Sequence, residues 1–86
     1  MTISRQLQDE LKKKGFAQAK LNLITYEDLF EYLNLNRIHV SIEYIYGGWW
    51  IYKVYLQNTL KAETDSKRDY RNARELGLIE GIKLLK

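Results

Sequence analysis

The chain has 86 residues, of which 14 are lysine or arginine and 11 are aspartate or glutamate, giving a formal net charge of +3. This length predicts one domain spanning residues 1–86, and a hydrophobic fraction of 45% is typical of a folded protein. The absence of cysteine excludes disulfides, thiolate metal sites and thiol nucleophiles. No apolar run is long enough to span a membrane, and the polar start lacks the apolar centre of a signal peptide. We therefore expect a cytoplasmic protein without a membrane partner.

The first predicted element is an amphipathic helix over residues 1–14. Ile3, Leu7 and Leu11 recur at helical spacing, and Gly15 suits the C-terminal cap. Because this apolar stripe has only three members, we expect residues 1–15 to dock loosely on the rest of the domain or on a partner.

A second helix is predicted to begin after Thr25 and to end near residues 34–36. Thr25 and Asp28 have the spacing of a capping box, and Ile24 is placed to contact Leu29 across the cap. The asparagines at the end favour a turn. The apolar face of this helix has four members: Tyr26, Leu29, Phe30 and Leu33.

A β-hairpin follows, with alternating apolar residues over 38–46 and 50–57 around Gly47 and Gly48. A two-residue turn would set the apolar positions of one strand against the polar positions of the other. A shift of one residue matches apolar with apolar and charge with opposite charge in three pairs: Tyr46 with Trp50, Ile42 with Val54, and Glu43 with Lys53. The sequence thus predicts a three-residue loop over 47–49, with a bulge where a glycine takes a positive φ.

The last part of the chain predicts an edge strand and a long helix. Residues 59–64 are a candidate third strand, with Leu60 and Ala62 facing inward. Ser66 and Asp69 have capping-box spacing and would open a helix to the C-terminus.

Small residues recur at four-residue spacing on this last helix, as Ala73, Gly77 and Gly81. Each glycine costs about 1 kcal/mol against alanine in a helix interior. The repeat therefore predicts that the helix backbone lies close to bulky side chains of the sheet, namely Trp50, Tyr52 and Tyr44.

The order α-α-β-β-(β)-α predicts an α+β fold, a small antiparallel sheet with its helices on one face. The opposite face would present eight residues: His39, Ser41, Glu43, Ile45, Ile51, Lys53, Tyr55 and Gln57. Two interpretations stay open. Either the first helix covers this face, or its exposed aromatic and aliphatic residues contact another protein, with a second copy of the chain the leading candidate. The interface candidates are Ile45, Trp49, Ile51 and Tyr55.

The sequence offers no constellation typical of an enzyme. His39 is the single histidine, the carboxylates from Glu27 to Glu31 are explained by the start of a helix, and Gly47-Gly48 lacks the context of a phosphate-binding loop. We expect a non-enzymatic binding module with no catalytic residue, no metal ligand and no cofactor.

The positive charge is concentrated in residues 66–74, which carry Lys67, Arg68, Arg71 and Arg74 against one aspartate. The α-β-β-(β)-α order, with Ser66-Lys67-Arg68 and Arg71 opening the last helix, resembles the double-stranded RNA-binding domain. This resemblance implies that the basic side chains contact phosphates. The chain departs from that family where Tyr70 replaces an alanine, where Ala62-Glu63-Thr64-Asp65 replaces a glycine-rich approach, and where Tyr46-Gly47-Gly48-Trp49 replaces a Gly-Pro-x-His loop. Nucleic-acid binding through these four residues is the alternative hypothesis.

A second resemblance covers residues 24–86. The stretch ITYEDLFEYL over residues 24–33, the hairpin with its central tryptophan and Tyr70-Arg71-Asn72-Ala73 resemble short uncharacterised α+β proteins of Bacteroidetes genomes and their phages. The resemblance implies a compact domain that self-associates as a homodimer, and an accessory role in a phage or mobile element. These proteins have no established activity, so the resemblance implies none for this chain.

Overall fold

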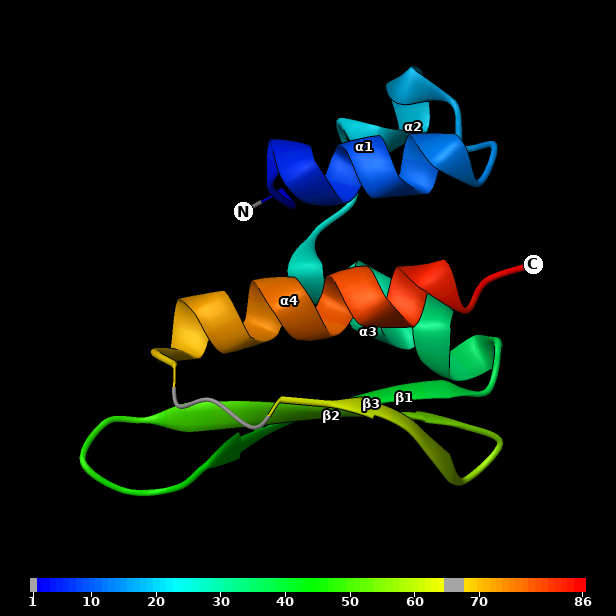
Figure 1. The fold of residues 1–86 in the computed structure, drawn as a ribbon. Coiled ribbons are helices and arrows are strands. Elements are labelled where there is room, and N and C mark those ends of the chain that lie inside the picture. The colour runs from blue at the N-terminus through cyan, green and yellow to red at the C-terminus, as the bar shows by residue number, and fades with distance from the viewer. Residues whose placement is uncertain (1, 65–67) are drawn as a thin grey trace.

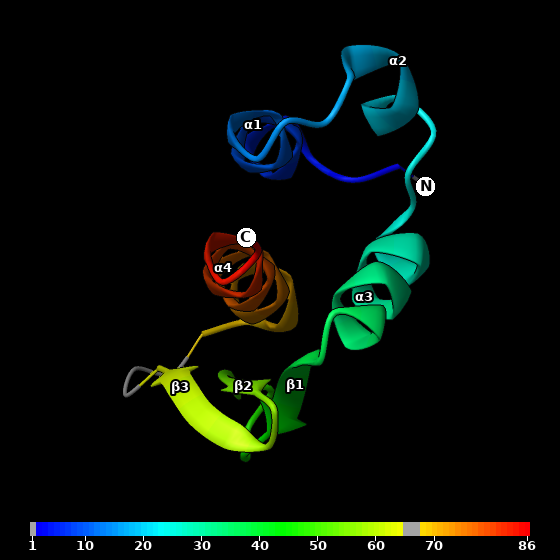
Figure 2. The same ribbon diagram turned by 90° about the vertical axis from the view of Figure 1, so that its right-hand side faces the viewer.

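The computed structural model describes residues 2–64 and 68–86 (Figure 1). Seven elements follow in chain order: α1 (Arg5–Lys13), α2 (Gln18–Leu21), α3 (Tyr26–Leu35), β1 (Ile38–Tyr44), β2 (Trp50–Leu56), β3 (Thr59–Glu63) and α4 (Tyr70–Lys83). The strands form one antiparallel sheet in the order β1-β2-β3, and α3 and α4 pack on the same face of it (Figure 2). The predicted α+β fold is confirmed, and the short helix α2 is an addition that the sequence did not indicate.

Helix α1 forms a further layer on the side of α4 that faces away from the sheet (Figure 2). The Ser4 side chain caps it by accepting a hydrogen bond from the N–H of Leu7 at 3.3 Å. The predicted stripe is buried in full, since Ile3 is 3% exposed and Leu7 and Leu11 are 0% exposed. The helix packs its whole apolar stripe against the rest of the domain, and the alternative that it covers the open face of the sheet is wrong.

Helix α3 begins at the predicted capping box. The Thr25 hydroxyl accepts from the N–H of Asp28, and the Asp28 carboxylate accepts from the N–H of Thr25, both at 3.1 Å. These hydrogen bonds, the backbone one first, lower the pKa of Asp28. Because the folded-state pKa lies below the unfolded one, the box adds stability above the unfolded pKa, and that stability is lost as the pH falls through the folded-state pKa.

The hairpin register differs by two residues from the predicted one. Val40 lies opposite Val54, and Tyr44 lies opposite Trp50, the last pair of the ladder. A two-residue shift leaves every side chain on its predicted face, because side chains alternate with a period of two. Lys53 and Glu43 still meet at 3.6 Å, along a diagonal rather than directly opposite.

The loop explains the shift. Gly47 and Gly48 both have positive φ, at 60° and 81°, and the N–H of Trp49 donates to the carbonyl of Tyr46 at 2.9 Å. Positive φ at both central residues is typical of a tight hairpin turn. The carbonyl of Trp49 also accepts from the N–H of Ile45 at 2.9 Å, so Ile45 and Tyr46 together oppose Trp49. The predicted bulge is present, but it lies before the glycines, and the predicted loop over 47–49 is wrong.

Strand β3 is confirmed as an edge strand, with one correction. The pairing is irregular between Val54 and Tyr55, so that Val54 lies opposite Ala62 while Tyr55 lies opposite Leu60. Ala62 therefore packs against the core, whereas Leu60 lies on the other face and is 44% exposed. The prediction that Leu60 faces inward is wrong because Lys61 is an extra residue in this strand.

Helix α4 begins later than predicted and approaches the sheet as closely as predicted. Asp69 caps it by accepting from the N–H of Asn72 at 2.8 Å, and Ser66 lies outside the described residues. A Cβ atom on Gly77 would lie 2.9 Å from Cβ of Tyr52, and one on Gly81 would lie 2.9 Å from Cγ2 of Val40. The predicted contact of the helix backbone with Tyr52 is confirmed. Its other close neighbour in the sheet is Val40, where Trp50 and Tyr44 were predicted.

Arg37 has a left-handed backbone, with φ 64°, directly after the cap of α3. Glycine is the usual residue at this position because it has no Cβ to clash with the carbonyl. Arg37→Gly is therefore expected to raise the free energy of unfolding by about 0.5–1 kcal/mol, the relief of strain exceeding the added freedom of the unfolded chain. Urea denaturation checks this, with Arg37→Gln as a control that keeps the strain. A less stable glycine variant would show that the guanidinium stabilises the fold.

Candidate interaction surface

Exposed large apolar side chains gather at the hairpin end of the molecule. We call this group the aromatic end, and it has five members: Tyr44, Ile45, Tyr46, Trp49 and Tyr70. Their exposed fractions range from 38% for Ile45 to 57% for Tyr44. The β1–β2 loop projects beyond the first turn of α4, so no other part of the described chain packs over it (Figure 1). Clustered exposed aromatic residues are typical of protein contact sites.

A short bridge between β2 and the segment before α4 builds this end. The N–H of Trp50 donates to the carbonyl of Arg68 at 2.7 Å, and the N–H of Arg68 donates back to the carbonyl of Trp50 at 3.1 Å. The bridge sets the Tyr70 ring edge-to-face on Trp50, with centroids 4.9 Å apart. Tyr44 packs edge-to-face on Trp50, at 5.3 Å. Such pairs stabilise by about 0.5–1.5 kcal/mol each, so they hold the Tyr44 and Tyr70 rings against Trp50.

The four predicted interface residues share one face but not one patch. Ile45 and Trp49 belong to the aromatic end, and Ile51 follows Trp49 on the same face of β2. Tyr55 lies four residues beyond Ile51, about 13 Å along the strand, and its ring stacks on His39 with centroids 6.1 Å apart. Ile51 and Tyr55 are half-buried, which leaves Ile45 and Trp49 as the members most open to a partner.

Three members of the aromatic end were not predicted as site residues. Tyr44 and Tyr46 were assigned to the inward face of the hairpin, and Tyr70 was noted only in the comparison with the two family patterns. They are exposed because α4 begins at Tyr70 and does not extend over the hairpin loop. For Tyr44 and Tyr46 the sequence did carry a signal, the change from Ile and Val to Tyr at the last inward positions of the first strand. A tyrosine ring can pack on apolar neighbours while its hydroxyl stays in water.

The predicted basic cluster is divided among different environments. Arg68 is half-buried beside Trp50, Arg71 is exposed, and Lys67 lies outside the described residues. The guanidinium of Arg74 lies 3.6 Å from the centroid of the Tyr26 ring and 5.5 Å from that of Tyr70. Arg74 therefore makes an internal cation–π contact, and its role in nucleic-acid binding stays a prediction.

Arg74 stands beside a hydrogen-bonded group that links three helices. The carboxylate of Glu75 accepts from the Ser4 hydroxyl at 2.6 Å and, with its other oxygen, from the Tyr26 hydroxyl. Burial, followed by the hydrogen bond to Glu75 and the charge of Glu75, raises the pKa of Tyr26. The phenol stays protonated as a donor at neutral pH, and the group joins α1, α3 and α4.

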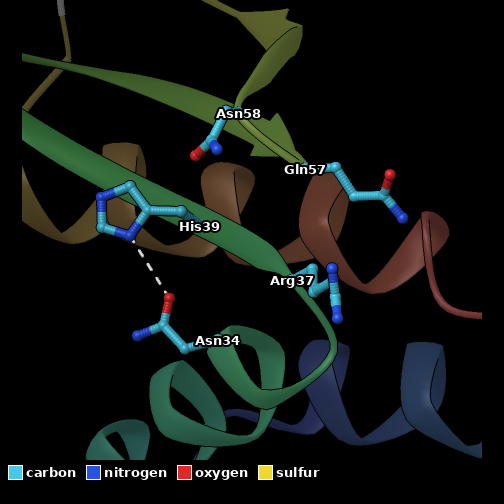
Figure 3. Close-up of a pocket in the computed structure, with 5 residues that line it drawn as sticks. All are labelled: Asn34, Arg37, His39, Gln57 and Asn58. Atoms are coloured by element: carbon cyan, nitrogen blue, oxygen red, sulfur yellow. Dashed lines mark hydrogen bonds between the residues drawn. The ribbon is translucent and has the colours of Figure 1, made fainter.

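A polar hollow lies at the opposite end of the molecule (Figure 3). It has a volume of about 560 Å³ and five lining residues, from the end of α3, the start of β1 and the β2–β3 turn: Asn34, Arg37, His39, Gln57 and Asn58. Nδ1 of His39 lies 3.3 Å from Oδ1 of Asn34, which fixes the orientation of the ring. His39 is exposed on its strand, as predicted.

Two classes of site have no candidate in residues 2–64 and 68–86. These ranges contain no group of three or more histidine and acidic side chains placed to hold a metal ion. They also contain no helix with the length and hydropathy needed to span a bilayer.

No protein-family model, curated protein or solved structure was found to match this chain. The resemblances to the double-stranded RNA-binding domain and to the Bacteroidetes and phage proteins therefore remain hypotheses.

Proposed function

We propose that this protein is a small non-enzymatic binding module that acts through protein contacts at its aromatic end, and that its partner is a second copy of the chain. The observation that carries the proposal is the exposure of Tyr44, Ile45, Tyr46, Trp49 and Tyr70 together at one end of the molecule. Tyrosine and tryptophan dominate the energetic centres of protein interfaces because they bury large areas with few rotatable bonds.

The charges of the surface favour a second copy over a partner of opposite charge. A two-fold contact brings the same patch of both copies together, so a patch of one sign would repel itself. The five members of the aromatic end carry no formal charge, and the neighbouring open face holds Lys53 and Glu43 as an ion pair at 3.6 Å. The five apolar side chains and the ion pair add no like charge to such a contact, whereas the exposed Arg71 beside Tyr70 adds one positive charge from each copy.

Trp49→Glu is expected to convert the dimer to a monomer, weakening association at least tenfold. The substitution places a charge in the centre of an apolar contact, where its desolvation is not compensated. Sedimentation equilibrium over a range of protein concentrations measures the effect.

Leu35→Glu is the matched control, because Leu35 is 77% exposed at the end of α3, away from the hairpin loop. It should leave association unchanged. A wild-type protein that stays monomeric at about 100 µM, or a Trp49→Glu variant that dimerises like wild type, would contradict the proposal.

Nucleic-acid binding is a second candidate, favoured by the bridge between Trp50 and Arg68. Next to this bridge, the exposed Arg71 lies in the first turn of α4 and directly follows Tyr70 of the aromatic end. Basic side chains beside aromatic rings are typical of surfaces on which single-stranded bases stack.

Arg71→Gln is the corresponding test, with Arg5→Gln on the exposed face of α1 as its charge-matched control. If nucleic acid is the ligand, wild type should bind an RNA oligonucleotide with an affinity that falls as salt rises, and Arg71→Gln alone should weaken binding and reduce the salt slope by about one. If the two variants weakened binding equally, the RNA would be attracted by the net charge of the protein and not by a site at Arg71.

A further inference from the structure

The polar hollow has the chemistry of an anion site. Its lining holds the Arg37 guanidinium, an imidazole and three carboxamides, and none of the five residues is a carboxylate. The guanidinium makes no ion pair with any acidic group among residues 2–64 and 68–86. An unpaired guanidinium surrounded by neutral donors is poised for charge-assisted hydrogen bonds to an oxyanion.

The backbone around the hollow supports a functional reading. Three non-glycine residues of the described chain have positive φ, Arg37 at 64°, Gln57 at 51° and Asn58 at 70°, and all three line this hollow. The N–H of Gln57 donates to the carbonyl of Arg37 at 2.9 Å and joins the two strained turns. Glycine or asparagine is the usual residue in such turns, so Arg37 and Gln57 place long polar side chains at the hollow where their backbone costs stability.

The end of α3 opposes an anion, but its effect is the smaller one. The C-terminus of a helix carries roughly half a negative charge. Three carbonyls of its last turn are occupied, since those of Tyr32 and Leu33 accept from the N–H of Asn36 and that of Asn34 accepts from the N–H of Arg37. The full positive charge of Arg37 therefore determines the sign of the site.

We propose that this hollow binds a phosphate monoester. Its donors come from the end of α3, the connection to β1 that holds Arg37, the start of β1 and the β2–β3 turn, and so lie on different sides of the hollow (Figure 3). Donors in several directions match the tetrahedral oxygens of a phosphate better than a planar carboxylate, for which one arginine fork is enough. A volume of about 560 Å³ exceeds the needs of a bare ion and leaves room for an organic group on the phosphate.

The test is an NMR titration of the ¹⁵N-labelled protein with O-phosphoserine, inorganic phosphate and serine. Phosphoserine should give saturable shifts at Arg37, His39 and the β2–β3 turn, with a dissociation constant on the order of 1 mM. Inorganic phosphate should bind the same residues more weakly, and serine should give no shift. Serine shifts equal to those of phosphoserine, or inorganic phosphate binding as tightly as phosphoserine, would overturn the proposal.

Variants separate this site from general charge attraction and from folding. Arg37→Gln should weaken phosphoserine binding at least tenfold, whereas Arg5→Gln should leave it unchanged. Arg37→Gly should lose binding equally while remaining folded, because the variant relieves backbone strain. Unchanged affinity in either Arg37 variant, or shifts that centre on Arg71, would refute the assignment. Trp49→Glu should bind phosphoserine as wild type does, since the two sites lie at opposite ends of the molecule.

Discussion

Leu7→Ala is expected to lower the free energy of unfolding by about 2–5 kcal/mol. Leu7 is 0% exposed, and its helix α1 packs on α4 rather than on the sheet. Truncation leaves a cavity at this contact, because the surrounding side chains close in only partly. Domains of this size have total stabilities of about 5–15 kcal/mol, so the loss would be a large part of the whole. Urea denaturation followed by circular dichroism measures it.

Leu23→Ala is the matched control for this change. Leu23 is 77% exposed in the segment between α2 and α3, so its truncation should change stability by no more than about 0.5 kcal/mol. Equal effects of the two variants would mean that α1 does not contribute to the folded core.

Gly81→Ala is expected to destabilise the protein by about 1–3 kcal/mol, against the helix preference of alanine. Alanine gains about 1 kcal/mol over glycine in a helix interior. Its Cβ, however, would lie 2.9 Å from Cγ2 of Val40 and 3.2 Å from Cδ1 of Leu33. The Leu33 methyl can move, but the valine side chain is held by its branched Cβ, so overpacking outweighs the gain.

The Val40→Ala background should reverse the sign of this effect. Removing both methyl groups of Val40 opens the space that the new Cβ needs, so Gly81→Ala should then stabilise by up to about 1 kcal/mol. Chemical denaturation of the four proteins of this double-mutant cycle measures the coupling. Additive changes would show that the helix does not approach the strand at this point.

The faces of the sheet were more predictable than its register. Ile38, Val40 and Val54 are buried on the predicted face because apolar alternation with a period of two specifies a face. The same alternation cannot distinguish registers that differ by two residues. The register is set instead by the backbone of Gly47 and Gly48. Their two positive φ values give a tight turn, with the bulge on the Ile45 side.

The candidate surfaces were only partly predictable, because they depend on where elements end. Ile45 and Trp49 were found from strand alternation, but the exposure of Tyr44 and Tyr46 follows from the late start of α4 at Asp69. The charge pattern marked Arg74, yet its stacking on Tyr26 depends on the packing of α3 against α4. The polar hollow joins residues about twenty positions apart, and no local pattern indicated it.

The central claim is that the aromatic end joins two copies of the chain. The most direct measurement is a filtered NOE experiment on an equal mixture of ¹³C-labelled and unlabelled protein. We expect intermolecular NOEs from the Trp49 indole of one copy to Ile45 and Ile51 of the other, and their loss in Trp49→Glu. Intermolecular NOEs confined to another surface, or none at concentrations at which the protein is fully folded, would contradict it.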